Sequence, residues 1–255
     1  MAKLLIVANW KMNPDSPGRA IVLAQKIERG ILRGNKNVEV IIAPPYPFLI
    51  PIGKVLKNAK LGAQNAFYAD VGPYTGEVSW HHLKHLKVSH VIIGHSERRI
   101  NLGETDELIN RKLKAVLQNG MSAILCVGEQ KREGNEIPSL VGEQIKMALY
   151  NVTRSQLKNL VIAYEPVWAV STTPGSRPDT PDNAFKAMLY IRKVISGLYG
   201  RAPAQSVKII YGGSVRANNA KSFLEEGKMQ GALVGRASLD PKEFGAILNR
   251  LSRRS

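Results

Sequence analysis

The sequence predicts an α/β protein, a single closed (β/α)8 barrel over residues 1–255. Short apolar segments rich in β-branched residues recur along the chain, and segments with the apolar spacing of helices separate them. Strands that alternate with helices pair in parallel through right-handed crossovers. Eight such units in 255 residues fit a closed barrel better than an open sheet, and no Gly/Ser-rich or Pro-rich linker divides the chain.

The predicted strands are the short apolar runs at 4–8, 38–43, 60–64, 88–93, 122–127, 160–164, 207–211 and 231–234. Helical spacing of apolar residues is clearest at 20–31, 141–152 and 184–195. Before the last of these, Thr180-Pro181-Asp182 is typical of a helix start, with Thr180 as the N-cap and proline at the first helical position.

Polar residues gather directly after the predicted strands: Asn9 and Lys11 after the first, Gln64 and Asn65 after the third, His95 to Glu97 after the fourth, Glu129 after the fifth, and Glu165 after the sixth. The carboxyl ends of barrel strands share one rim, so we expect these side chains to converge on one pocket. Glu165 is the first candidate, because Pro166 cannot continue the strand that ends there. Taken alone, its carboxylate fits a solvated loop equally well.

Glycine-containing turns follow the seventh and eighth predicted strands, as Gly212-Gly213-Ser214 and as Gly235-Arg236. Glycine lets a backbone approach a ligand closely, so the N–H groups of these turns can point at phosphate oxygens. Either turn alone fits a plain strand-to-helix connection equally well. Two adjacent turns at the expected positions favour a phosphate site.

The charge balance is strongly basic: Lys and Arg number 36 against 20 Asp and Glu, a net charge of +16. This indicates anionic partners, which include nucleic acid, a membrane surface or a phosphorylated metabolite. The basic residues are scattered, and their densest group, Arg250, Arg253 and Arg254, lacks the interleaved aromatics of single-strand binders, so nucleic-acid binding is not favoured.

No stretch approaches the length of a membrane helix, and the apolar run at 4–8 is too short for a signal core, so we expect a cytoplasmic protein without a membrane partner. Cys126, the one cysteine, lies in an apolar run and is predicted to be a buried thiol in a reducing compartment rather than a nucleophile. His81, His82 and His85 have a spacing that can bind a metal on a helix, but no acid accompanies them, and a plain surface helix is favoured over a metal site.

Six motifs of this sequence resemble those of the triosephosphate isomerases, in family order and along the whole chain. They are Asn9-Trp10-Lys11-Met12-Asn13, Gly94-His95-Ser96-Glu97-Arg98-Arg99, Gly103-Glu104-Thr105, Cys126-Val127-Gly128-Glu129, Ala163-Tyr164-Glu165-Pro166-Val167-Trp168 and Tyr211-Gly212-Gly213-Ser214. The resemblance implies a TIM barrel and an aldose–ketose isomerase of glycolysis and gluconeogenesis. Such an enzyme interconverts dihydroxyacetone phosphate and D-glyceraldehyde 3-phosphate by proton transfer through an enediolate.

By this resemblance Glu165 is the catalytic base, His95 the electrophile and Lys11 the cation that faces the substrate. This pairing of a glutamate base with a neutral histidine is the standard description of the family. Asn9 is expected to contact substrate oxygens, and Glu97 to steady Lys11. No cofactor is implied, because the proton stays on protein and substrate. The segment 74–77 corresponds to the family's loop that enters a partner subunit's pocket, which implies a homodimer.

The expected lid over the substrate, residues 171–179, departs from the family pattern Ala-Ile-Gly-Thr-Gly-Lys. Ser171 and Thr173 occupy its glycine positions, and the loop is longer. Ser171 keeps an N–H group for the phosphate, but proline and β-branched residues are expected to stiffen the lid and change closure or product release. Arg236 also stands where a second glycine is usual. These departures leave one alternative open, a sugar-phosphate-binding barrel with impaired catalysis, which the presence of Glu165 and His95 disfavours.

Overall fold

The computed structural model describes residues 3–32, 37–171 and 173–252. Thr172 of the expected lid and Arg253 and Arg254 of the basic tail lie outside these residues. The single domain expected over residues 1–255 also includes them and stays a prediction.

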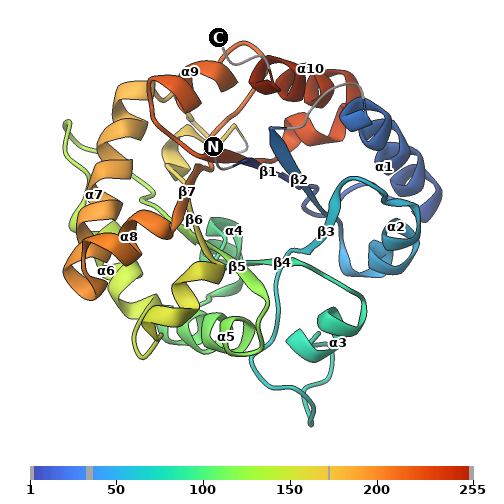
Figure 1. Ribbon diagram of the computed structural model, residues 1–255, viewed down its shortest axis with the longest axis horizontal. Coiled ribbons are helices and arrows are strands. Elements are labelled where there is room, and N and C mark those ends of the chain that lie inside the picture. The colour runs from blue at the N-terminus through green and yellow to red at the C-terminus, as the bar shows by residue number, and fades with distance from the viewer. Residues whose placement is uncertain (1–2, 33–36, 172, 253–255) are drawn as a thin grey trace.

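Eight parallel strands close into a barrel in chain order, with the helices arranged around it, as Figure 1 shows. The strands are β1 (Leu4–Asn9), β2 (Val38–Ala43), β3 (Lys60–Ala63), β4 (His90–Ile93), β5 (Ser122–Val127), β6 (Leu160–Tyr164), β7 (Lys208–Tyr211) and β8 (Gly231–Val234). The predicted (β/α)8 barrel is thereby confirmed. β4 begins two residues later than predicted, because the N–H of Val88 still bonds the carbonyl of Leu83 in the preceding helix (3.0 Å).

The helices are α1 (Pro17–Leu32), α2 (Leu49–Val55), α3 (Trp80–His85), α4 (Ser96–Leu102), α5 (Asp106–Gln118), α6 (Ser139–Ala148), α7 (Pro181–Tyr199), α8 (Arg201–Ser206), α9 (Ala220–Glu225) and α10 (Pro241–Ser252). Short 3-10 helices are η1 (Tyr46–Phe48), η2 (Arg154–Asn159), η3 (Val167–Ala169) and η4 (Arg236–Leu239). The predicted start of α7 is confirmed, since the Thr180 hydroxyl accepts the N–H of Asn183 at 3.2 Å. No helix within the described residues has the length and apolar character needed to span a membrane.

The strands are apolar on both faces because two separate cores cover them. In β1, Leu5 and Val7 point into the barrel, where they join an inner cluster that includes Ile124 and Ile210. Leu4 and Ile6 point outward and pack under the surrounding helices. Continuous burial of this kind explains why the strands read as unbroken apolar runs rather than as alternating ones. Side chains fill the barrel interior, so a ligand has room only at its rims.

Candidate active site

A cavity of about 270 Å³ opens at the rim formed by the carboxyl ends of the strands. It brings together the predicted catalytic and substrate-binding residues, which come from positions distant in the chain: Asn9, Lys11, His95, Glu165, Ser171, Ser214, Gly235 and Arg236. Glu97 lies beside this group and reaches it through Lys11. The expected convergence on one pocket therefore occurs for these residues, while their chemical roles stay predictions. It was wrong for Gln64, Asn65 and Glu129, which do not line the cavity: Glu129 turns instead into a buried network with Tyr164 and Trp168.

Glu165 follows β6 directly, and only 3% of its surface is exposed. Its backbone N–H donates to the carbonyl of Val127 on β5, at 2.8 Å. One carboxylate oxygen, Oε1, lies 3.1 Å from Nε2 of His95, and the other, Oε2, accepts the backbone N–H of Ser96 at 2.9 Å. The carboxylate is thus held by hydrogen bonds at the edge of the cavity.

Two glycines of neighbouring strand ends leave room for Glu165. A Cβ atom added at Gly128 would lie 1.8 Å from the carbonyl oxygen of Glu165, and one added at Gly212 would lie 2.7 Å from its Cγ. Gln144 of α6 fixes the backbone of Gly128 through two hydrogen bonds. Its side-chain oxygen accepts the Gly128 N–H (2.8 Å), and its side-chain NH₂ donates to the Gly128 carbonyl (3.1 Å). The sequence motifs contained both glycines without indicating that they pack on the glutamate.

His95 is the N-cap residue of α4, and its ring Nδ1 accepts the backbone N–H of Glu97 at 3.2 Å. A ring nitrogen that accepts a hydrogen bond carries no proton, so the proton of the neutral ring lies on Nε2. Nε2 is the atom that faces Glu165. The geometry therefore fits the expected neutral imidazole that donates a hydrogen bond into the cavity.

Lys11 has a left-handed backbone, with φ of +53°, which costs a residue other than glycine about 1–3 kcal/mol. Its N–H donates to the side-chain oxygen of Asn9 (3.0 Å), and its carbonyl accepts the side-chain amide of Gln64 (2.8 Å). Its ammonium lies 2.6 Å from Oε1 of Glu97. Asn9 therefore orients Lys11 in addition to lining the cavity. Gln64 was expected at this rim from its place after the third strand, but no role was assigned to it; its contact with the Lys11 carbonyl shows that it supports the lysine.

The predicted phosphate end of the cavity is formed by Gly213, Ser214, Gly235 and Arg236. The N–H of Ser171 reaches this end and donates to the hydroxyl of Ser214 at 2.8 Å, and that hydroxyl donates to the carbonyl of Ala169, also at 2.8 Å. The start of the expected lid is thus bonded to the turn after β7.

Further charged residues line the same end of the cavity, and sequence reasoning missed all of them. They are Arg216, Asp240 and Glu243. Arg216 is exposed, and its position two residues after Ser214 was the signal that could have identified it. With Arg236 it makes two arginines among the residues that line the cavity, together with the carboxylates of Asp240 and Glu243.

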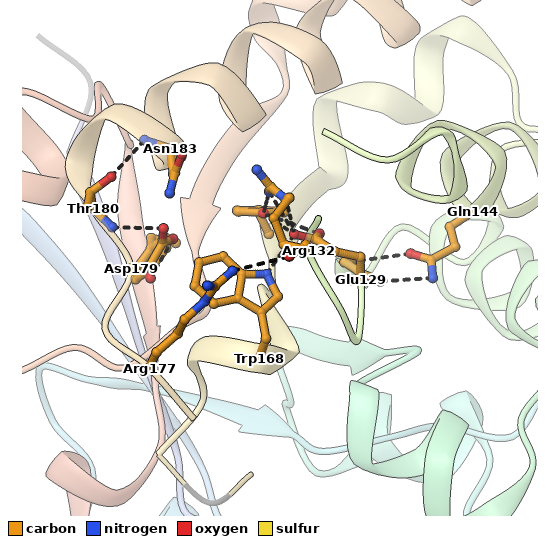
Figure 2. A network of polar contacts seen from close by, with 11 residues as sticks. Glu129, Arg132, Gln144, Trp168, Arg177, Asp179, Thr180 and Asn183 are labelled. Atoms are coloured by element: carbon orange, nitrogen blue, oxygen red, sulfur yellow. Dashed lines mark hydrogen bonds and ion pairs between the residues drawn. The ribbon is translucent and has the colours of Figure 1, made fainter. Parts of the chain in front are cut away.

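A buried polar network lies behind the cavity and is drawn in Figure 2. Glu129, after β5, is 1% exposed, and its Oε1 accepts hydrogen bonds from the Trp168 ring (2.9 Å), the Tyr164 hydroxyl (2.9 Å) and the Arg132 guanidinium (2.7 Å). The buried charge of Glu129 is thereby paired and fully bonded at this oxygen. Burial, with the nearby Glu129 carboxylate, raises the pKa of Tyr164 well above its ordinary value. The network joins the β5–α6 loop to the base of the expected lid.

Cys126 is fully buried, as predicted. Burial, reinforced by the Glu165 carboxylate, raises the pKa of its thiol well above the ordinary value and disfavours the reactive thiolate. In α3, Nδ1 of His82 accepts the N–H of Ser79 (3.3 Å), and Nδ1 of His85 lies 3.0 Å from the carbonyl of His81. These ring nitrogens take part in local helix hydrogen bonding.

Comparison with known proteins gives a consistent result. The family model described as triosephosphate isomerase matches residues 4–251. The triosephosphate isomerase of Chlorobium phaeobacteroides (strain BS1) is 41% identical over 253 residues, which cover 98% of this chain and 99% of that protein. The one from Carboxydothermus hydrogenoformans is 42% identical over 252 residues, 97% of this chain and 98% of the relative. The one from Thermoanaerobacter sp. (strain X514) is 40% identical over 253 residues, 98% of this chain and all of the relative.

Proposed function

Because this chain belongs to the triosephosphate isomerase family, we propose that Glu165, His95 and Lys11 carry its reaction, with Glu165 as the base. The reaction interconverts dihydroxyacetone phosphate and D-glyceraldehyde 3-phosphate. The observation that carries the assignment is the 3.1 Å separation of Glu165 Oε1 and His95 Nε2 at one cavity, beside the Lys11 ammonium. A base, a hydrogen-bond donor and a cation are the groups that a proton shift next to a carbonyl requires.

The proton transfer follows from these positions. Glu165 removes a proton from the substrate carbon next to the carbonyl, and the electron pair moves onto the carbonyl oxygen to form the enediolate. The Nε2–H of His95 donates a hydrogen bond to that oxygen, and the positive charge of Lys11 stabilises the negative charge that develops there. The hydroxyl proton on the deprotonated carbon passes to the former carbonyl oxygen, and Glu165 returns its proton to the former carbonyl carbon, which leaves the new carbonyl group on the carbon that was first deprotonated. The 2.6 Å contact with Glu97 holds Lys11 in place for this step.

The substrate phosphate is held, in this proposal, at the end of the cavity formed by Gly213, Ser214, Gly235 and Arg236, with the N–H of Ser171 from the lid. Backbone N–H groups at such turns suit a phosphate dianion, and Arg236 adds a positive charge. Asn9 contributes to the substrate site mainly by orienting Lys11. The catalytically impaired alternative has less support, because the groups that the reaction needs lie around the same cavity.

The test is a coupled assay with D-glyceraldehyde 3-phosphate, in which the wild type is compared with Glu165→Gln. Loss of a general base lowers turnover by about 10²- to 10⁴-fold, so we expect kcat to fall by at least that range. Glu143→Gln, on the exposed side of α6, is the matched control and should leave kcat unchanged. An active Glu165→Gln variant would refute the assignment, and a wild type that binds a phosphorylated enediolate mimic without turnover would favour the impaired alternative.

The homodimer is also a proposal. The segment between β3 and α3 projects away from the barrel in Figure 1, and it carries Val71, 70% exposed, and Tyr74, 41% exposed. Tyr74 packs against Phe67, with ring centroids 4.7 Å apart and the ring planes inclined by 51°, so the projection is internally packed rather than loose. Exposed apolar side chains on an ordered projection suit a protein interface. Light scattering should give twice the 28.0 kDa mass of one chain, and a monomer at micromolar concentration would contradict it.

A cytoplasmic location is the last part of this proposal. The buried free thiol of Cys126 suits a reducing compartment, and the substrates are small phosphorylated metabolites. Cell fractionation with an antibody to the native protein tests it, and recovery in the membrane or external fraction would contradict it.

A further inference from the structure

The second half of the lid is bonded to the body of the protein through Arg177. The Arg177 N–H donates to the carbonyl of Trp168 at 3.1 Å, and its guanidinium donates to the carbonyl of Arg132 at 3.2 Å. That guanidinium also lies over the Trp168 ring, 5.0 Å from its centre. Figure 2 draws the two side chains next to each other. This part of the lid is therefore attached to the buried network around Trp168.

Asp179 makes a second attachment, at the end of the lid. Its Oδ1 accepts the N–H of Thr180 at 2.8 Å, and its Oδ2 accepts the hydroxyl of Tyr211 at 3.0 Å. Thr180 is the N-cap of α7, and Pro178 and Pro181 restrict the backbone on both sides. The Asp179 carboxylate is thus presented to Tyr211 from a rigid support.

Tyr211 is the last residue of β7 and is only 1% exposed, with its ring stacked on Phe223 at 4.0 Å. A Cβ atom added at Gly213 would lie 2.3 Å from the Tyr211 hydroxyl, so this hydroxyl lies directly against the predicted phosphate turn. One hydroxyl therefore contacts both Asp179 of the lid and Gly213 of the turn. The lid and the phosphate turn meet at this oxygen.

We propose that Asp179 is a positioning residue for the isomerisation, which acts through the Tyr211 hydroxyl to hold the lid and the Gly213-Ser214 turn in register with the substrate phosphate. The inference rests on the proposed function of this cavity. Asp179 itself does not line the cavity, so its effect reaches the substrate through Tyr211. Ser171 and Ser214 form the second link between the same lid and the same turn, at 2.8 Å.

The pKa of Asp179 distinguishes a positioning role from a stabilising one, because it indicates whether the ionised carboxylate favours the folded state. Burial raises the pKa of Asp179 above its ordinary value of 3.8, despite the opposing hydrogen bonds. When folding raises the pKa of a carboxyl group, the free energy of unfolding decreases as the pH rises through that pKa. The ionised Asp179 carboxylate at neutral pH is therefore unfavourable for folding. The titratable and charged groups that face it from the elements around it are Tyr211, Tyr164 and Arg132. Asparagine at position 179 removes a partly buried charge, and we therefore expect it to leave the protein as stable or more stable.

The experiment compares Asp179→Ala, Asp179→Asn and Tyr211→Phe in the full-length protein, with Asp182→Asn as the matched control. Asp182 is exposed and contacts Lys186 on the outside of α7. Displacement of a binding group costs roughly 10- to 100-fold, so we expect Asp179→Ala to lower kcat/KM for D-glyceraldehyde 3-phosphate by that factor, mainly through KM. Asp179→Asn, which keeps an acceptor oxygen, should restore part of this loss at an unchanged or higher melting temperature.

The double variant Asp179→Ala/Tyr211→Phe provides the decisive comparison. If Asp179 acts through Tyr211, the two losses in kcat/KM will not multiply, because the second change removes a contact already lost. Fully multiplicative losses would overturn the proposal, as would an Asp179→Ala variant that melts lower with KM unchanged. If Glu165→Gln is inactive while all Asp179 variants behave as the wild type, only this inference fails. If Glu165→Gln is active, the proposed function of the cavity fails.

Discussion

Gly212 lies so close to Glu165 that an added Cβ atom would stand 2.7 Å from the Cγ of the glutamate and 3.0 Å from the carbonyl oxygen of Tyr164. The carbonyl belongs to a buried strand and cannot yield, so Gly212→Ala must displace the Glu165 side chain. A displacement of about 1 Å at a reacting group lowers the rate about 10²-fold. We therefore predict a loss of this size in kcat, measured in the coupled assay.

Gly245→Ala is the control for this change. Gly245 lies in α10, where an added Cβ meets nothing within 4 Å, and alanine is favoured over glycine inside a helix. This control should retain full activity with equal or greater stability. Equal kcat values for the two variants would show that Gly212 is not needed to place the base.

The ion pair of Lys11 and Glu97 gives a second prediction. The Glu97 side chain is 41% exposed, and pairs of this kind contribute only about 0–1 kcal/mol to stability. We expect Glu97→Gln to melt as the wild type does but to lower kcat/KM about tenfold, because the Lys11 ammonium is no longer held toward the cavity. Glu225→Gln, which breaks an exposed pair with Lys221 on α9, controls for the loss of one carboxylate. A drop in melting temperature without a change in kcat/KM would assign Glu97 to stability alone.

Arg236 and the net charge of +16 lead to a third prediction, about ionic strength. A positive field accelerates capture of a dianionic substrate, and salt screens that field, so kcat/KM should fall as salt rises. Arg236→Gln should lower kcat/KM and flatten the salt dependence. Arg201→Gln removes the same charge at the start of α8, a helix that leads into the opposite end of the barrel, and should do neither. A wild-type profile that is flat in salt would contradict the prediction.

His90 provides a fourth prediction, which concerns stability in acid. Burial lowers the pKa of His90 from 6.5 to about 4, and Lys60 and Lys208 add to this, while Glu39 opposes it. The unfolded chain therefore binds the proton first as the pH falls below 6.5, and stability is lost between that pH and the folded pKa. At about pH 4.5 this group alone should lower the free energy of unfolding by about 2–3 kcal/mol.

Urea unfolding at neutral pH and at about pH 4.5 measures this effect, with wild type compared with His90→Gln. The variant should lose less stability on acidification than the wild type does. Parallel losses in the two proteins would mean that other groups account for the acid sensitivity.

The sequence by itself determined the fold class and most of the candidate site. Apolar runs bounded by polar residues give the strand positions to within two residues, because strands buried on both faces need continuous apolar stretches. Thr180 before Pro181 predicted the start of α7, because an N-cap hydrogen bond joins residues that are close together in the sequence. The convergence of Lys11, His95 and Glu165 followed from the single rim that parallel barrel strands share.

Only the tertiary structure decided which partner each of these groups has. The contacts of Gly212 with Glu165, of Ser171 with Ser214 and of Asp179 with Tyr211 join residues from different β/α units. No local pattern encodes such pairs, because they depend on the register of the closed sheet and on how far each side chain extends from its strand. Local chemistry determines the element that a residue forms, whereas barrel closure determines its neighbours.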